Sequence, residues 1–189
     1  MTAASVRRFT VEEYHRLAEF GVLHEDDRVE LLNGQIIEMM PIGPFHGGSV
    51  NWLGKIFHGL DRDRWITSTQ NPVRLGPHDE PQPDLLLLRP RPDFYRAQHP
   101  TPADVFLLVE VSDSTLLIDR AEKLPVYARS GIPEVWIVNL PERFVEIYRE
   151  PTGGGYADAQ KVRAGEPLAP AAFPDAAIDT AALLGSVGN

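Results

Sequence analysis

The strongest structural signal in the chain is the run Val105-Phe106-Leu107-Leu108-Val109-Glu110-Val111, which is apolar at six of its seven positions. A second run, Pro83-Asp84-Leu85-Leu86-Leu87-Leu88, has the same character. Neither run alternates between apolar and polar residues, and this pattern predicts strands that are buried on both faces. Each run nevertheless carries one carboxylate, Glu110 or Asp84, among otherwise uncharged residues.

The elements that follow these runs predict a mixed sheet. Val135–Val138 is a third buried strand, and a helix is expected to start near Asp119, to carry Lys123 and to stop near Gly131. A parallel pairing of Leu107–Val111 with Val135–Val138 through this helix would be a right-handed crossover. With antiparallel hairpins on either side, the order predicts an α/β (α+β) fold, a mixed β-sheet flanked by helices.

The rest of the chain contains shorter elements. Thr10 and Glu13 have the spacing of a capping box, which predicts a helix over 11–20. Asn33-Gly34 predicts a hairpin with a type I′ turn, because this turn requires positive φ at both positions. Pro125 should kink the helix near Asp119 or displace its start. The other expected features are a helix that buries Val50, Leu53, Phe57 and Leu60, strands at 65–69, 73–75 and 144–149, loops at 89–102 and 152–156, and an Ala- and Pro-rich tail from Ala164.

Length, charge and cysteine content limit the possible functions. The 189 residues fit a single domain over 1–189, and the formal net charge is −9. The chain has 0 Cys, which excludes disulfides, cysteine-ligated zinc, iron–sulfur clusters and a thiol nucleophile. We see no membrane span and no signal peptide, so we expect a cytoplasmic protein with no membrane partner. The acidic balance argues against nucleic-acid binding through basic charge alone, unless a divalent cation offsets it.

The carboxylates of the two apolar runs are candidates for a metal site. A buried, ionised carboxylate is costly unless it is paired or bound to a metal ion. Asp84 and Glu110 lie at the ends of strands expected to be neighbours, where they can converge on one hard cation. Lys123, on the next helix, can point its amine back at them. The alternatives are structural: Asp84 as a turn residue, Glu110 in an ion pair with a buried arginine, and Lys123 on a solvated helix face.

Taken together, these residues form a wider pattern: Pro-Asp at 83–84, Glu-Val-Ser at 110–112 and a lysine on the next helix. The pattern resembles the PD-(D/E)XK nuclease superfamily, in which two acids hold a metal ion and a lysine assists the attacking water. Nearly the whole chain is similar to the Uma-type restriction endonuclease family of that superfamily, through VELLNGQ at 29–35, PFHG at 44–47, VEVS at 109–112, DRAEK at 119–123 and GIPEVWIV at 131–138. This resemblance implies a restriction-endonuclease-like fold in one nuclease-like domain.

The resemblance implies a metal-dependent endonuclease that hydrolyses DNA with Mg²⁺ or Mn²⁺. Asp84, Glu110 and the backbone carbonyl of Val111 are the implied metal ligands. Glu30 corresponds to an acidic residue that the superfamily contributes from an N-terminal element, which completes the metal shell. Superfamily nucleases that cut both strands are often dimers, so the resemblance also implies a homodimer.

The catalytic lysine departs from the superfamily pattern. That pattern places a lysine where this chain has Ser112, so the resemblance implies that Lys123 reaches the same point in space. His46 lies in a segment that the family shares, where it either lines the entrance of the site or caps the second helix.

Two other functions stay open. One is a degenerate nuclease fold that binds nucleic acid or protein without cutting, and the other is a metal-dependent hydrolase of small phosphate esters. A group of arginines either lines a cleft near Asp84 or belongs to the ordinary surface: Arg62, Arg64, Arg74, Arg89, Arg91 and Arg96.

Overall fold

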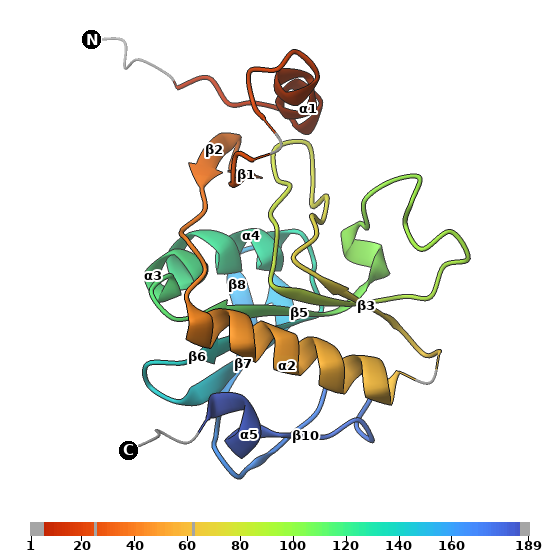
Figure 1. Ribbon diagram of the computed structural model, residues 1–189, viewed down its shortest axis with the longest axis vertical. Helices are drawn as coiled ribbons and strands as arrows, with labels where there is room; N and C mark the ends of the chain where they lie inside the picture. Colours follow the sequence, from red (N-terminus) through yellow and green to blue (C-terminus); the bar gives the residue numbers. More distant parts are fainter. Residues whose placement is uncertain (1–5, 25, 62, 186–189) are drawn as a thin grey trace.

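The structure is a computed structural model that describes residues 6–24, 26–61 and 63–185 (Figure 1). Arg62, one of the candidate arginines, lies outside these residues. None of the described helices is long and apolar enough to cross a membrane.

The helices are α1 (Val11–Glu19), α2 (Pro44–Leu60), α3 (Leu116–Ile118), α4 (Leu124–Arg129) and α5 (Thr180–Leu184), with a 3₁₀ turn η1 (Pro102–Asp104) and a π-helical turn η2 (Asp119–Lys123). The strands are β1 (Val29–Leu32), β2 (Gln35–Glu38), β3 (Ile66–Thr69), β4 (Leu85–Leu88), β5 (Val105–Ser112), β6 (Glu134–Asn139), β7 (Phe144–Thr152), β8 (Gly155–Arg163), β9 (Pro167–Leu168) and β10 (Ile178–Asp179).

A six-stranded mixed sheet in the order β3-β4-β5-β6-β7-β8 forms the centre of the molecule. β5 and β6 are parallel, as predicted, and the other neighbouring pairs in this sheet are antiparallel. The chain joins the parallel pair through α3, η2 and α4. The predicted fold class, a mixed sheet flanked by helices, is therefore confirmed.

Both faces of the sheet are covered, which explains why its central strands do not alternate. On one face, Leu107 and Val109 of β5 belong to the core cluster that includes Phe57 of α2. On the other face, Leu108 belongs to the cluster that includes Tyr127 of α4. Since successive side chains of a strand point to opposite faces, Glu110 shares the α4 face with Leu108.

The crossover helix changes its hydrogen-bond pattern just before Pro125. In η2 the N–H of Leu124 donates to the carbonyl of Asp119, five residues back, instead of four as in an α-helix. Pro125 has no N–H and stands in the first turn of α4, where a missing donor costs little. The expected disturbance at Pro125 is thus a π-helical turn, and Lys123 is its last residue.

Several local predictions differ from the structure. Residues 73–75 do not form a strand, because Val73 and Leu75 donate to the carbonyls of Pro81 and Asp79 in an extended loop instead of joining the sheet. The loop expected at 152–156 is a tight turn, with β7 ending at Thr152 and β8 starting at Gly155. β8 itself was not predicted, since its mostly exposed residues lack an apolar pattern.

The β1–β2 hairpin has the predicted turn. Asn33 and Gly34 have φ of 54° and 69°, and β1 and β2 pair antiparallel on either side. A Cβ added to Gly34 would lie 2.5 Å from Cβ of Arg8, far inside van der Waals contact. Both the dihedral and the packing therefore require glycine at this position.

We predict that Gly34→Ala lowers the free energy of unfolding by about 1–3 kcal/mol, the usual cost of a strained backbone conformation. Gly59→Ala is the matched control, since Gly59 is helical and a Cβ there meets nothing within 4 Å. Alanine favours the helix, so the control should be neutral or slightly stabilising. Urea denaturation of both variants checks this, and equal effects would contradict it.

Candidate active site

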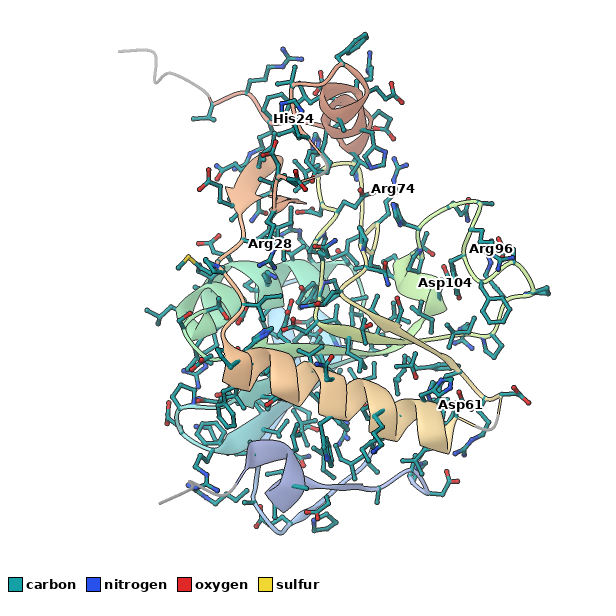
Figure 2. The ribbon with its side chains drawn as sticks, viewed as in Figure 1. His24, Arg28, Asp61, Arg74, Arg96 and Asp104 are labelled. Atoms are coloured by element: carbon teal, nitrogen blue, oxygen red, sulfur yellow. The ribbon has the colours of Figure 1, made fainter. Side chains whose placement is uncertain are left out.

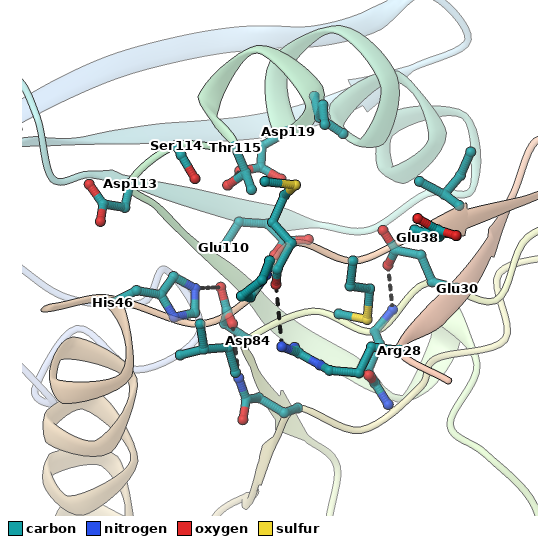
Figure 3. A pocket seen from close by; sticks show the side chains of 18 of the residues that line it. Arg28, Glu30, Glu38, His46, Asp84, Glu110, Asp113, Ser114, Thr115 and Asp119 are labelled. Atoms are coloured by element: carbon teal, nitrogen blue, oxygen red, sulfur yellow. Dashed lines mark hydrogen bonds and ion pairs between the residues drawn. The ribbon is translucent and has the colours of Figure 1, made fainter. Parts of the chain in front are cut away.

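Asp84 and Glu110 come together at one end of the two central strands. β4 and β5 pair with Leu85 opposite Val109 and Leu86 opposite Leu108. Continuing this antiparallel register by one residue places Asp84 opposite Glu110, on the same face of the sheet. Figure 3 shows both carboxylates in one pocket, together with His46 and Glu30.

Lys123 lies between two buried carboxylates. Its Nζ is 3.1 Å from Oε1 of Glu30 and 3.3 Å from Oε1 of Glu110. The side chain of Lys123 is 8 % exposed, and those of both glutamates are 4 % exposed. Tyr127, one helical turn after Lys123, also donates its hydroxyl to Oε1 of Glu110. The predicted approach of Lys123 to Glu110 is therefore observed, while its second carboxylate partner is Glu30 and not Asp84. The solvated-face alternative is not observed.

Glu30 comes from β1, which does not belong to the central sheet. Its Oε1 binds Lys123, and its Oε2 accepts a 3.0 Å hydrogen bond from the backbone N–H of Gln82. The neighbouring residue Leu31 exchanges backbone hydrogen bonds with Glu80. The segment before Asp84 thus holds β1 against the rest of the molecule and fixes the position of the Glu30 carboxylate.

Asp84 is held by three donors from different elements. Its Oδ2 accepts from the N–H of Val111 at 2.8 Å and contacts Nε2 of His46 at 3.1 Å, and its Oδ1 lies 3.5 Å from the amide nitrogen of Gln70. The position of Pro83 leaves the carbonyl of Val111 without a ladder donor. The β4–β5 register places Pro83 opposite Val111, and proline has no N–H with which to continue the ladder.

Ser112, where the superfamily pattern has a lysine, has a different partner. Its hydroxyl is fully buried and donates to Oδ2 of Asp119 at 2.7 Å. Thr115 donates to the same oxygen at 2.7 Å. The side chain at position 112 therefore fixes Asp119 at the start of η2, four residues before Lys123.

Burial and charge shift the pKa values of these groups in different directions. Burial raises the pKa of Glu110 to about 8, although the nearby ammonium of Lys123 opposes the shift. For Lys123, burial disfavours the charge, but the carboxylates of Glu110 and Glu30 outweigh it and raise the pKa. The hydrogen bond from His46 to Asp84 raises the pKa of the imidazole. Such shifts in one pocket are typical of functional sites.

The pocket is open to small ligands and is acidic. It encloses about 90 Å³, where a single water needs about 10–15 Å³. Its charged lining includes Asp113, Asp119 and Glu38 as well as the residues above, and Arg28 is the arginine among them. The fully buried Tyr127 and the pocket residues Asp119 and Arg28 were not predicted as site residues; the spacing of Tyr127 from Lys123 on one helix was the available signal.

The described candidate arginines do not line this pocket. Arg64 pairs with Asp175, Arg74 with Glu12, and Arg91 with Asp93. Arg89 donates to the carbonyl of Ala103 and lies over the ring of Phe106. Figure 2 shows Arg96 on the loop at the right of the view, away from Arg28. A cluster of these arginines at the mouth of the pocket next to Asp84 is therefore not what the structure shows.

Two comparisons with known proteins gave matches. The model of the Uma2 family, described as "Putative restriction endonuclease", matches residues 11–181. The chain belongs to this family. Among solved structures, the chain is similar to a "putative nuclease belonging to DUF820" from Anabaena variabilis, with a TM-score of 0.69, 14% sequence identity, and coverage of 93% of this chain and 97% of the other. At that identity the likeness supports the fold alone, and a search of curated proteins found no match.

The carboxylates of this Uma2 member differ in how free they are to bind a metal ion. Both oxygens of Glu30 have partners, and one partner is the ammonium of Lys123, which repels a cation. The oxygens of Asp84 also have partners, but the contact of Oδ1 with Gln70 is long, at 3.5 Å. The hydrogen bonds and ion pairs found for Glu110 all fall on Oε1, so among the described residues Oε2 has no donor. Glu30, Asp84 and Glu110 do not form a group of three with ligand atoms within 4.8 Å of one another. The geometry thus favours Glu30 as the partner of Lys123 over Glu30 as a metal ligand.

We predict that Lys123→Met lowers the free energy of unfolding by about 3–5 kcal/mol, because it leaves Glu30 and Glu110 buried without their cation. In the double variant Lys123→Met/Glu110→Gln, one of these charges is gone. The loss should then be smaller than the sum of the single losses by on the order of 1 kcal/mol or more. Chemical denaturation of the three variants measures this coupling, and additive losses would mean that the ion pair is energetically unimportant.

Proposed function

We propose that this Uma2 protein is a metal-dependent endonuclease that hydrolyses phosphodiester bonds of DNA, with Mg²⁺ or Mn²⁺ as its cofactor. The observation that carries the proposal is the position of Lys123. Its ammonium contacts Glu110 from the neighbouring helix, although the chain has a serine at the expected lysine position. An acid pair next to a buried lysine is the set of groups that this reaction class requires.

The residues at the end of β4 and β5 fit a hard divalent cation. Asp84 and Oε2 of Glu110 offer carboxylate oxygens, and the carbonyl of Val111 receives no ladder hydrogen bond from Pro83. Mg²⁺ usually takes one or two carboxylates and keeps several waters, and the pocket has room for them. When bound, such an ion polarises a phosphoryl oxygen and lowers the pKa of a coordinated water.

The protein's own groups would then position and stabilise the reactants. Lys123 carries a fixed positive charge beside Glu110, where it orients the attacking water and stabilises negative charge that develops on the phosphate. Glu30 keeps the ammonium in place from the other side. His46 and the N–H of Val111 hold the Asp84 carboxylate in one orientation. Each of these groups is fixed before substrate binds, which is the condition for efficient electrostatic catalysis.

The net charge of −9 is compatible with this function if the cation is part of the substrate site. Without it, the carboxylates of the pocket repel a phosphate, and with it they hold the charge that attracts one. Most of the described arginines already donate to carboxylates or carbonyls of the chain. We therefore propose that the metal supplies much of the attraction at the scissile phosphate. We include in the proposal a cytoplasmic homodimer, whose two sites would cut the two strands.

We predict Mg²⁺- or Mn²⁺-dependent cleavage of duplex DNA, and its loss on addition of EDTA. Asp84→Asn, Glu110→Gln and Lys123→Arg should each lower the rate by at least about 100-fold, the scale of losing one preorganised electrostatic group. Asp158→Asn, at a partly exposed carboxylate on β8 whose hydrogen bonds come from Gln160, should cut like the wild type. Gel assays with folded variants, verified by circular dichroism, test this.

Two results would overturn the assignment. Cleavage by Lys123→Arg at the wild-type rate would remove the lysine from the mechanism. Metal-independent DNA binding that survives all three substitutions, with no cleavage at any enzyme concentration, would favour the non-cutting binding module. Faster turnover of small phosphate esters than of DNA would favour a phosphoesterase instead.

We predict that His46→Ala weakens metal-dependent activity by about 10–100-fold, the usual effect of removing a group that orients a metal ligand. The Mg²⁺ concentration at half-maximal rate should rise, and His46→Gln, which can still donate to Asp84, should recover part of the loss. Mg²⁺ titrations of cleavage distinguish this from a surface role. An unchanged Mg²⁺ dependence in His46→Ala would contradict it.

A further inference from the structure

A second cluster of metal-ligating groups lies outside the candidate active site. His15 of α1, Glu80 of the 70–84 segment and His99 of the 89–104 loop place one ligand atom each within 4.8 Å of one another. Among the described residues, no other group of three or more such side chains meets this condition. Nε2 of His15 lies 2.6 Å from Oε1 of Glu80, and the two imidazole rings are 6.3 Å apart.

Glu80 provides an independent indication that this cluster binds a ligand. The residue is only 4 % exposed, and its Oε2 is buried with no hydrogen-bond partner. A buried carboxylate oxygen without a donor is costly, so this oxygen calls for a bound water or ion. The same carboxylate lines a cavity of about 580 Å³ together with His15 and His99. The unsatisfied group therefore belongs to a space that a ligand can enter.

We propose that His15, Glu80 and His99 form a second metal site, which takes a borderline divalent ion of the Zn²⁺ type. Imidazole nitrogen favours Zn²⁺ and similar transition metals, whereas Mg²⁺ prefers all-oxygen shells. Two histidines and one glutamate are a known zinc ligand set that leaves a fourth position for water. This site shares no residue with the Asp84–Glu110 pocket, so it is separate from the proposed nuclease cofactor.

Such an ion would tie together three segments that are distant in sequence. Figure 1 shows α1 above the loops of the 70–84 segment, with the 89–104 loop extending to the side. Two arginines line the same cavity: Arg74 is paired with Glu12, and Arg96 lies on the exposed loop. The ion would therefore fix the loop that carries Arg96 to the N-terminal helix.

Zn²⁺ titration of the full-length, chelator-treated protein tests the proposal by isothermal calorimetry and thermal denaturation. We expect one equivalent to bind with millimolar Mg²⁺ present and to raise the melting temperature. His99 is exposed, so His99→Ala should leave the fold intact and weaken Zn²⁺ binding by at least about tenfold, since even an outer-shell change can cost that much. His58→Ala, an 83 % exposed histidine on α2, is the matched control and should bind like the wild type.

The nuclease pocket needs a separate control, because Zn²⁺ can also bind carboxylates there. The double variant Asp84→Asn/Glu110→Gln should retain the Zn²⁺ equivalent that His99→Ala loses. X-ray absorption of the loaded protein should show imidazole nitrogens at about 2.0–2.1 Å from the metal. Binding that is lost in the double variant but unchanged in His99→Ala, or no Zn²⁺ binding at all, would overturn the second site and leave the proposed nuclease untouched.

Discussion

The buried ammonium of Lys123 between Glu30 and Glu110 is the interaction on which the arrangement of the site depends. Three ionisable groups are taken out of water here, and each is tolerable only while the others stay in contact. They come from β1, β5 and η2, so three elements must keep their positions together. Because β1 lies outside the central sheet, this ion pair and its neighbouring hydrogen bonds join the hairpin to the core.

Two features of the chain make that arrangement possible. The first is Pro83, which has no N–H to donate to the carbonyl of Val111, while the N–H of Val111 donates to the Asp84 side chain. The second is the π-helical turn before Pro125, whose first residue, Asp119, accepts hydrogen bonds from Ser112 and Thr115. A π-helical turn spaces side chains differently from an α-helix, and such turns often occur at functional sites. The hydrogen bonds at these two places hold the carboxylates of Asp84 and Asp119 in position.

The sequence predicted the core of this structure better than its edges. The unbroken apolar runs of β4, β5 and β6 identified the buried strands, and the lone carboxylates within them identified Asp84 and Glu110. β8 was missed because its residues are mostly exposed and carry no period. The partners of the candidate arginines could not be predicted either, since the ion pairs Arg64–Asp175 and Arg74–Glu12 join residues far apart in the chain. Contacts of that kind depend on tertiary packing, which no local pattern records.

The segment from Glu80 to Asp84 connects the candidate active site with the His15–Glu80–His99 cluster. The backbone of Glu80 pairs with Leu31, the N–H of Gln82 binds Glu30, and Asp84 faces Glu110. This short stretch therefore contacts both carboxylate partners of Lys123: Gln82 binds Glu30, and Asp84 lies opposite Glu110. The side chain of Glu80, in the same stretch, lies next to those of His15 and His99. One continuous backbone therefore supports both carboxylates, Glu30 through the N–H of Gln82 and Asp84 directly. A bound ion or a substitution that changes how this segment is held acts on the positions of both.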